Sequence, residues 1–240
     1  ADAAPYLAGA AVVALLRGLA GTRRQNYAPM APATAAGIVF CLIRSGLAVA
    51  GYAGADAIRR SNCVILTDTD LFPPGTVSLN GLKIYGEESG KVISYAATMA
   101  HASQSGLSRL FDTLLEGEGG RLEPLDDLSF YEEGGVSGLI HGETVLFGTA
   151  AFCRKMHVTM PGGLSLKTGA FLAVDGTLIA VFAVKYTAAE NVDWALHALK
   201  RSRITPVLAV RDGSITPALL KRKFGTDARA VYPTISTRLA

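Results

Sequence analysis

The sequence predicts an α/β protein in which a parallel-sheet domain is interrupted by an α+β insert. Two apolar runs, 63–67 and 206–210, have the length and bounds of strands that are buried on both faces, as in a parallel sheet. Between these runs, two apolar segments flank the turn Asp175-Gly176, which is the pattern of an antiparallel hairpin. This order indicates two domains with a cleft between them, the insert covering residues 83–182.

Composition and charge restrict the class of protein. Of 240 residues, 50% are hydrophobic and 18% are charged, and the formal net charge is +3. Because no long basic run accompanies this charge, we expect no nucleic-acid partner. The basic groups at 200–203 and 221–223 are typical of solvated helix ends. Cys41, Cys63 and Cys153 form no CxxC pair, which predicts reduced, buried thiols in a cytoplasmic protein.

Residues 1–45 are predicted to form apolar helices. The runs 6–16 and 31–43 are separated by a polar turn, and neither reaches the roughly 18–20 residues of a clean spanning helix. Their Ala- and Gly-rich composition suits tightly packed membrane helices, and it also suits a buried helical hairpin. We expect transmembrane and stalk helices here, since the start lacks the basic residues of a signal peptide.

The first α/β part is predicted from short runs bounded by glycine, proline or polar residues. Residues 46–51 have the pattern of a strand, and 53–60 that of a short helix ending in two arginines. The run 63–67 follows, and apolar residues then alternate over 77–85 as they do in a strand.

Two helices are expected next, at 92–100 and 106–115. The second has apolar side chains at helical spacing, which places it against the core. We expect Trp194 to anchor a later amphipathic helix in the core. The further expected elements are strands at 128–132, 138–140 and 144–147, a helix at 150–156, strands at 170–174 and 178–184, a helix at 188–201, a strand at 206–210, a helix at 216–224 and a strand at 228–232.

Asp68 directly follows the strand 63–67, and Asp70 follows two residues later. In open α/β sheets, ligands bind at the carboxyl ends of the strands. An aspartate at that position can act as a nucleophile or, with a second carboxylate, hold Mg²⁺. The structural alternative is an acidic turn, since Asp and Pro are ordinary turn residues and Pro73 follows closely.

Two glycine-rich segments and a later aspartate, Asp212, are the other candidate site features. Gly134-Gly135-Val136-Ser137-Gly138 is followed by a second glycine-bounded segment, 142–148. The hairpin turn at Asp175, the helix 188–201 and Thr205-Pro206-Val207 then lead to Asp212.

In order and spacing, these features resemble the headpiece of a P-type ATPase, nearest the heavy-metal-transporting branch. In that family a haloacid-dehalogenase-like, Rossmann-like phosphorylation domain is split by a nucleotide-binding domain. Pro32 and the elements at 46–51 and 53–60 precede Asp68 at matching spacing, so Asp68 takes the place of the phosphorylated aspartate. The implied domains are membrane and stalk helices (1–45), a phosphorylation-like domain (46–82 and 183–240) and a nucleotide-binding-like domain (83–182).

The resemblance implies a membrane protein with cytoplasmic domains, and ATP and Mg²⁺ as cofactors if the chain is active. The catalytic residues would be Asp68, Asp70 and Asp212, with Mg²⁺ held by Asp68 and Asp70. The implied nucleotide-binding residues are Ser105, Gly134, Gly135, Gly138 and Gly148.

Several family motifs are replaced in this chain. Where the family has Lys-Thr-Gly-Thr after the aspartate, this chain has Thr69, Asp70, Leu71 and Phe72. The further replacements are Ser103-Gln104-Ser105-Gly106 for Ser-Glu-His-Pro, Glu133 for a glycine, Lys185 for the hinge aspartate, and Val210-Arg211-Asp212 for Thr-Gly-Asp. Gly-Asp-Gly-x-x-Asp and a later transmembrane pair are also missing, so we expect a fragment.

Three functions follow from this combination. The first is a degenerate pseudo-ATPase with a binding or regulatory role, because stabilising a transferring phosphoryl group needs several preorganised groups at once. The second is an active cation-transporting ATPase phosphorylated on Asp68. The third is a haloacid-dehalogenase-like phosphohydrolase, in which Asp70 would protonate the leaving group.

Overall fold

The computed structural model describes residues 37, 40, 44, 61–161, 168–225 and 230–240. The chain forms two compact units, 1–61 and 62–240, and the second is the subject here. The apolar helices predicted at 1–45 lie outside the described residues, apart from three helical positions. The elements predicted at 46–51 and 53–60 also lie outside them. Within the described residues, no helix has the length and apolar character needed to cross a membrane.

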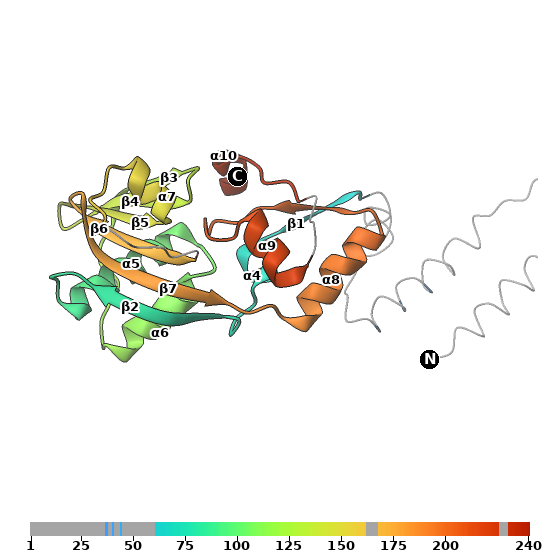
Figure 1. The fold of residues 1–240 in the computed structure, drawn as a ribbon, viewed down its shortest axis with the longest axis horizontal. Helices are drawn as coiled ribbons and strands as arrows, with labels where there is room; N and C mark the ends of the chain where they lie inside the picture. The colour runs from blue at the N-terminus through green and yellow to red at the C-terminus, as the bar shows by residue number, and fades with distance from the viewer. Residues whose placement is uncertain (1–36, 38–39, 41–43, 45–60, 162–167, 226–229) are drawn as a thin grey trace, which may run out of the picture. The chain divides into compact units, whose positions relative to one another are not determined.

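A six-stranded antiparallel sheet makes up much of this unit (Figure 1), and it confirms the predicted hairpins. Its strand order is β2-β7-β6-β5-β4-β3. The strands are β2 (Val77–Ile84), β3 (Asp126–Tyr131), β4 (Gly135–Ile140), β5 (Glu143–Gly148), β6 (Gly169–Val174) and β7 (Thr177–Tyr186). At the β6–β7 turn, Asp175 and Gly176 have φ values of 47° and 78°, and positive φ at both central residues is typical of a type I′ hairpin.

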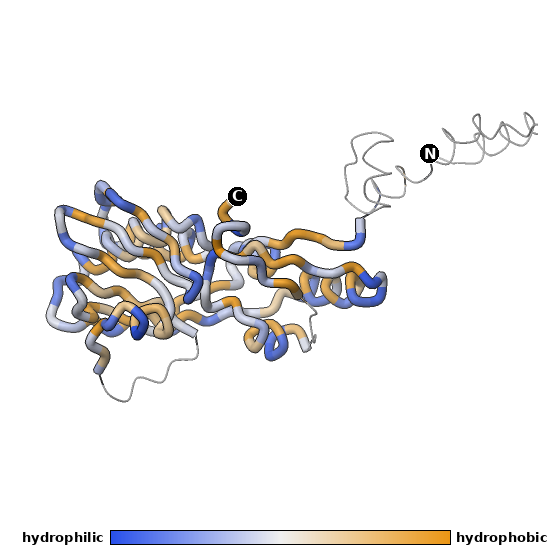
Figure 2. Tube along the Cα trace, turned by 90° about the horizontal axis from the view of Figure 1, so that it is seen from above, coloured by the Kyte–Doolittle hydropathy of each residue, from blue (hydrophilic) through white to orange (hydrophobic). Residues whose placement is uncertain are grey.

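Helices cover both faces of this sheet (Figure 1). The helices α5 (Ser89–Ser103) and α6 (Ser108–Gly117) pack on one face and α7 (Ala150–Lys155) on the other. Every residue of β6 is buried, because Leu172 packs with the α5 and α6 core while Phe171 packs with Phe152 of α7. The hydropathy colouring shows the apolar segments running along these strands (Figure 2).

The parallel pair β1 (Cys63–Leu66) and β8 (Thr205–Leu208) forms a separate sheet. Its neighbours in the chain are α4 (Asp68–Leu71), α8 (Glu190–Arg201), α9 (Pro217–Phe224) and α10 (Ile235–Leu239). Neither α4 nor α10 was expected from the sequence. In the predicted strand 228–232, Val231 forms an isolated parallel bridge to Val207, and 226–229 lie outside the described residues. The mixed α/β class is therefore confirmed, whereas the haloacid-dehalogenase-like interruption stays a prediction.

Three burial predictions for this sheet and α8 are wrong. The strand β1 is not buried on both faces, because Ile65 is 66% exposed. The Cys63 thiol, predicted to be buried, is exposed. Trp194 is 67% exposed rather than in the core. Val192 and Leu196 are the buried residues of α8, and the helical period places Trp194 on the opposite side. The Cys153 thiol is buried as predicted, and Cys41 lies outside the described residues.

Candidate functional site

Asp68 connects two strand ends that are far apart in the sequence. It is the first residue of α4, directly after β1, and only 4% of it is exposed. The backbone N–H of Arg211 donates to its Oδ2 at 2.9 Å, and that of Asp212 donates to its Oδ1 at 2.7 Å. Both carboxylate oxygens of Asp68 therefore accept hydrogen bonds from the loop after β8.

Asp212 extends this contact to the six-stranded sheet. It is 5% exposed, and its Oδ1 accepts the backbone N–H of Ser214 at 2.8 Å. The hydroxyl of Tyr186, the last residue of β7, donates to its Oδ2. The Tyr186 ring also packs edge-on against Phe72 just after α4, with ring centroids 4.9 Å apart. Sequence reasoning missed Tyr186, since no local motif marks the residue that meets Asp212.

Burial dominates the protonation of this pair of carboxyls. Burial raises the pKa of Asp68, and the N–H groups of Arg211 and Asp212 oppose that rise. Burial, followed by the charge of Asp68, raises the pKa of Asp212 to about 6. Burial and the neighbouring Asp212 carboxylate raise the pKa of Tyr186 well above its ordinary value, so its hydroxyl remains a donor.

The raised pKa of Asp212 predicts a dependence of stability on pH. The folded state holds a proton up to about pH 6, whereas the unfolded carboxyl loses it near 3.8. The stabilisation from this group is complete below pH 3.8 and is lost as the pH rises through 6, a change of about 3 kcal/mol. The Asp212→Asn variant removes the titration and keeps one of the two acceptor oxygens, so it should start less stable, but its unfolding free energy should fall less between pH 4 and 7. Urea unfolding at several pH values measures this, and equal slopes for variant and wild type would contradict it.

Asp70 faces away from this arrangement. Its Oδ2 accepts the backbone N–H of Thr67 at 2.8 Å and the Thr67 hydroxyl at 2.7 Å, which forms a capping box at the start of α4. The Asp68 oxygens are also engaged, and the part of the chain that the structure describes holds no group of three metal-ligating side chains. Asp68 and Asp70 therefore have different hydrogen-bond partners in this conformation, and Mg²⁺ at this pair stays a prediction.

The predicted nucleotide glycines are close-packing positions in this fold. A Cβ on Gly135 would lie 2.0 Å from the ring of Phe152, and one on Gly148 would lie 2.4 Å from the Cα of Gly135. A Cβ on Gly138 would lie 2.5 Å from Cδ1 of Leu125. Contacts this short leave no room for a side chain at Gly135 and Gly148, whereas the Leu125 methyl near Gly138 can move, so close packing explains the first two glycines without a ligand.

Gly134 and Ser105 lie where the sheet meets the loop after β8. A Cβ on Gly134 would lie 2.5 Å from the Cα of Gly213, so the two backbones touch. Ser105 is 7% exposed and accepts the Ser103 hydroxyl at 3.1 Å. The space lined by Ser105, Gly134, Gly135, Gly148 and Asp212 has a volume of about 30 Å³. Ligand pockets usually measure roughly 300–1,000 Å³, so this space does not fit a nucleotide in this conformation.

A larger cavity of about 590 Å³ lies beside this space. The side chain of Arg238 on α10 borders it, donating from Nη1 to the carbonyl of Val210 at 2.7 Å and pairing through Nη2 with Oε2 of Glu132 at 3.3 Å. Tyr232 and Thr216 also line it. Gly134 and Asp212, two residues of the predicted site, also line this cavity, and its walls come from five separate segments of the chain, so no local motif marks the rest of it.

No protein-family model and no curated protein matches the chain, but solved structures do. The catalytic domain of the CPx-ATPase CopB-B, described in a study of its conformational changes upon nucleotide binding, matches with a TM-score of 0.53 and 14% identity, over 81% of this chain and 69% of that one. The N-domain of HMA8, a copper-transporting P-type ATPase, matches with a TM-score of 0.39 and 16% identity, over 44% of this chain and 98% of that one. A zinc-transporting PIB-type ATPase matches with a TM-score of 0.38 and 12% identity, over 77% of this chain and 31% of that one.

The first of these matches establishes similarity of fold to a P-type ATPase catalytic domain. The resemblance seen in the sequence is therefore confirmed at the level of fold. The roles of the predicted site residues and the predicted domain boundaries stay predictions.

Proposed function

We propose that the chain is the headpiece of a degenerate P-type ATPase with a binding or regulatory role. In this proposal Asp68 is a structural carboxylate rather than a phosphate acceptor. The observation that supports it most directly is the pair of backbone hydrogen bonds at 2.9 and 2.7 Å that engage both oxygens of Asp68. Membrane attachment through residues 1–45 and the division at 46–82, 83–182 and 183–240 belong to the same proposal.

A nucleophilic carboxylate needs an oxygen directed at the phosphoryl group. The α5–α6 connection also crowds Asp68, since a Cβ on Gly106 would lie 2.9 Å from the Asp68 Cβ. Leu71 is fully buried in α4, where a glycine would allow backbone amides to approach a phosphate. Phosphorylation of Asp68 would therefore require its hydrogen bonds to break and this connection to move away.

The direct test is acid-stable labelling of the chain from radiolabelled MgATP. We expect the wild-type chain to incorporate no more label than Asp68→Asn, because the carboxylate is engaged. Label that is present in wild type and in Asp70→Asn but absent in Asp68→Asn would contradict the proposal and favour the active transporter.

An active ATP-driven cation transporter is the second candidate, and the fold similarity to the CopB-B catalytic domain favours it. It requires ATP to enter between the glycine segment and the loop after β8, which means that the backbones of Gly134 and Gly213 separate. Calorimetric titration with millimolar ATP tests this requirement. We expect no heat of binding and no rise in melting temperature, and saturable binding would favour the second candidate.

The phosphohydrolase reading requires Asp70 to leave Thr67 and approach Asp68. We expect no phosphate release from a generic aryl phosphate. Release that is lost in Asp70→Ala would support this third candidate instead.

A further inference from the structure

The solvent-facing side of α8 presents a tryptophan. Trp194 is the single tryptophan of the chain, and 67% of it is exposed. Tryptophan is highly buried on average, so an indole presented to solvent from the middle of a helix is unusual. Val192 and Leu196 already attach α8 to the core from its other side. Trp194 therefore adds little to the packing of α8, and its indole is accessible on the outer side of the helix.

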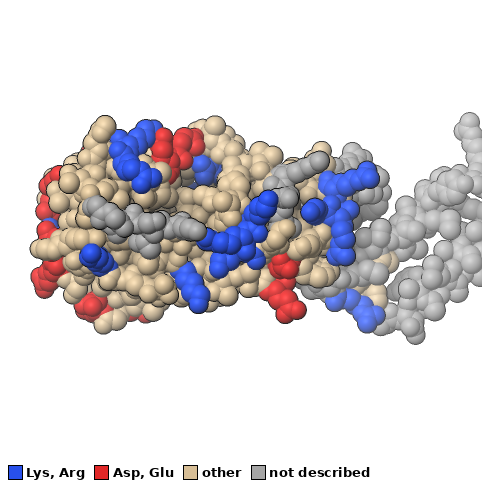
Figure 3. Space-filling model, in the orientation of Figure 1, with Lys and Arg blue, Asp and Glu red and all other residues tan. Residues whose placement is uncertain are grey.

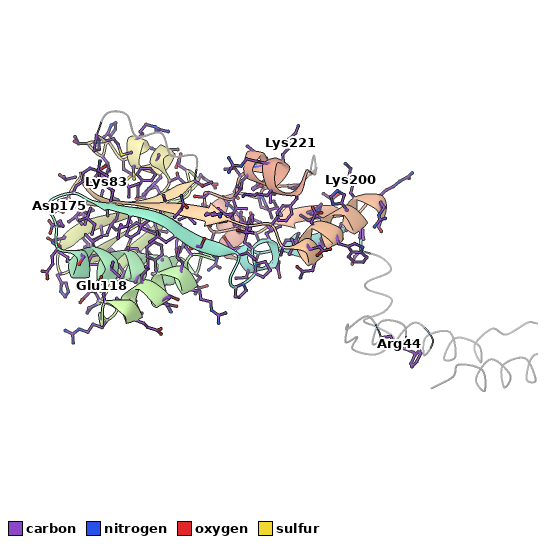
Figure 4. All side chains as sticks on the ribbon, turned by 60° about the horizontal axis from the view of Figure 1, so that its bottom comes forward. Arg44, Lys83, Glu118, Asp175, Lys200 and Lys221 are labelled. Carbon is purple, nitrogen blue, oxygen red and sulfur yellow. The ribbon has the colours of Figure 1, made fainter. Side chains whose placement is uncertain are left out.

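Three exposed basic residues lie at the C-terminal end of the same helix. They are Lys200, Arg201 and Arg203, and Arg201 follows Trp194 by two helical turns, which places both on one side. Lys200 projects outward from the end of α8 (Figure 4). Lys and Arg side chains gather over the part of this unit that holds α8 and α9 (Figure 3). We call Trp194, Lys200, Arg201 and Arg203 the Trp194 surface.

The acidic residues of α8 lie at its other end. Glu190 and Asp193 occupy the first turn, and Asp193 pairs through Oδ1 with Nδ1 of His197 at 3.5 Å. The positive charge is therefore concentrated from Lys200 onward, about two turns beyond the indole.

We infer that the Trp194 surface docks on an anionic lipid bilayer. Indole rings partition to the membrane–water interface, because they combine a large apolar body with one N–H donor. Lys and Arg beside such a ring are attracted by the negative potential of anionic headgroups. The three exposed cations give this end of α8 a charge complementary to anionic headgroups, since the acidic residues of the helix lie in its first turn. The inference uses described residues alone and does not depend on the proposed function.

Trp194 itself reports the docking, since it is the only indole in the full chain. We expect its fluorescence to shift to the blue on vesicles of phosphatidylcholine with about 30% phosphatidylserine, and not on phosphatidylcholine alone. Brominated lipids in the anionic vesicles should quench it, and about 0.5 M NaCl should reverse both effects. Attachment of the chain through another segment would not reproduce a signal confined to Trp194.

Two matched double variants distinguish docking through the Trp194 surface from a nonspecific attraction of the positively charged chain to anionic vesicles. Lys200→Gln with Arg201→Gln should weaken the apparent affinity for anionic vesicles by roughly tenfold or more. Arg109→Gln with Arg121→Gln removes two exposed charges on α6 and the loop after it, and should change the affinity by less than about twofold. Urea unfolding of each variant checks that both remain folded.

Several outcomes would overturn the inference. One is an emission already shifted to the blue without vesicles, which would mean that residues 1–61 or a second copy cover the indole. Another is an equal blue shift of Trp194 emission on neutral and anionic vesicles. A third is an equal loss of affinity for anionic vesicles in the two double variants. A shift produced by nucleic acid and not by anionic vesicles would assign the surface to that class of partner instead.

Discussion

The Asp68→Ala variant is expected to lose about 4 kcal/mol of unfolding free energy, because two buried N–H groups lose a charged acceptor. These are the backbone amides of Arg211 and Asp212, which donate to Asp68 at 2.9 and 2.7 Å. The same bonds connect the end of β1 to the loop after β8, so their loss weakens the contact between two distant segments. Urea unfolding at pH 7, followed by far-UV circular dichroism, measures the change.

Asp70→Ala is the matched control, since Asp70 is exposed and only two residues away. It caps α4 through Thr67, and losing such a cap costs about 1 kcal/mol. The loss of unfolding free energy in Asp68→Asn should lie between those of Asp68→Ala and Asp70→Ala. The amide oxygen can accept one of the two backbone N–H groups, and the amide NH2 faces the other. A cost for Asp68→Ala no larger than that for Asp70→Ala would contradict a structural role for Asp68.

Local patterns were sufficient for most elements of this fold, apart from the short helices α4 and α10. Alternating apolar residues and the Asp175-Gly176 turn predicted the β6–β7 hairpin, and the positive φ values show why that turn suits it. Helical spacing in 106–115 predicted a helix that packs against the core, and α6 buries Phe111 and Leu115. Such signals are carried by neighbours in the sequence, which is why they can be interpreted without the structure.

The errors came from contacts and faces that depend on distant residues or on the exact side of an element. Tyr186 meets Asp212 across the two sheets, and no spacing in the sequence marks that pair. Trp194 was a different failure, since the period from Val192 to Leu196 already places it on the outer side of α8. Its size suggested burial, and the helical period gave the better prediction.

The nucleotide role predicted for Gly135 and Gly148 and the packing role seen in the structure predict different experimental results. Gly135 and Gly148 resembled residues that approach a nucleotide, whereas in the structure they lie against Phe152 and against each other. A nucleotide role predicts an unchanged fold and weaker ATP binding after substitution. A packing role predicts a loss of stability with or without nucleotide.

Gly135→Ala is accordingly expected to lose about 3 kcal/mol or more of unfolding free energy through overpacking. The new Cβ would lie 2.0 Å from the Phe152 ring, which is fully buried and packs against Tyr131 with centroids 5.1 Å apart. Gly90→Ala in α5 is the matched control, because its Cβ would meet nothing within 4 Å. It should be neutral or stabilise the chain by about 0.5 kcal/mol through helix propensity.

Shortening Phe152 distinguishes a side-chain obstacle from a backbone one. In the double variant Gly135→Ala with Phe152→Leu, the smaller side chain gives room to the new Cβ, so the two costs should sum to more than the measured loss. Gly148→Ala should show no such rescue, because its Cβ would first meet the Cα of Gly135 at 2.4 Å and the carbonyl oxygen of Gly134 at 2.6 Å. Additive losses in the first pair would mean that the ring is not the obstacle at Gly135. Rescue of Gly148→Ala by Phe152→Leu would mean that the β4–β5 backbones can separate. A ligand at the glycine segment would require the same movement.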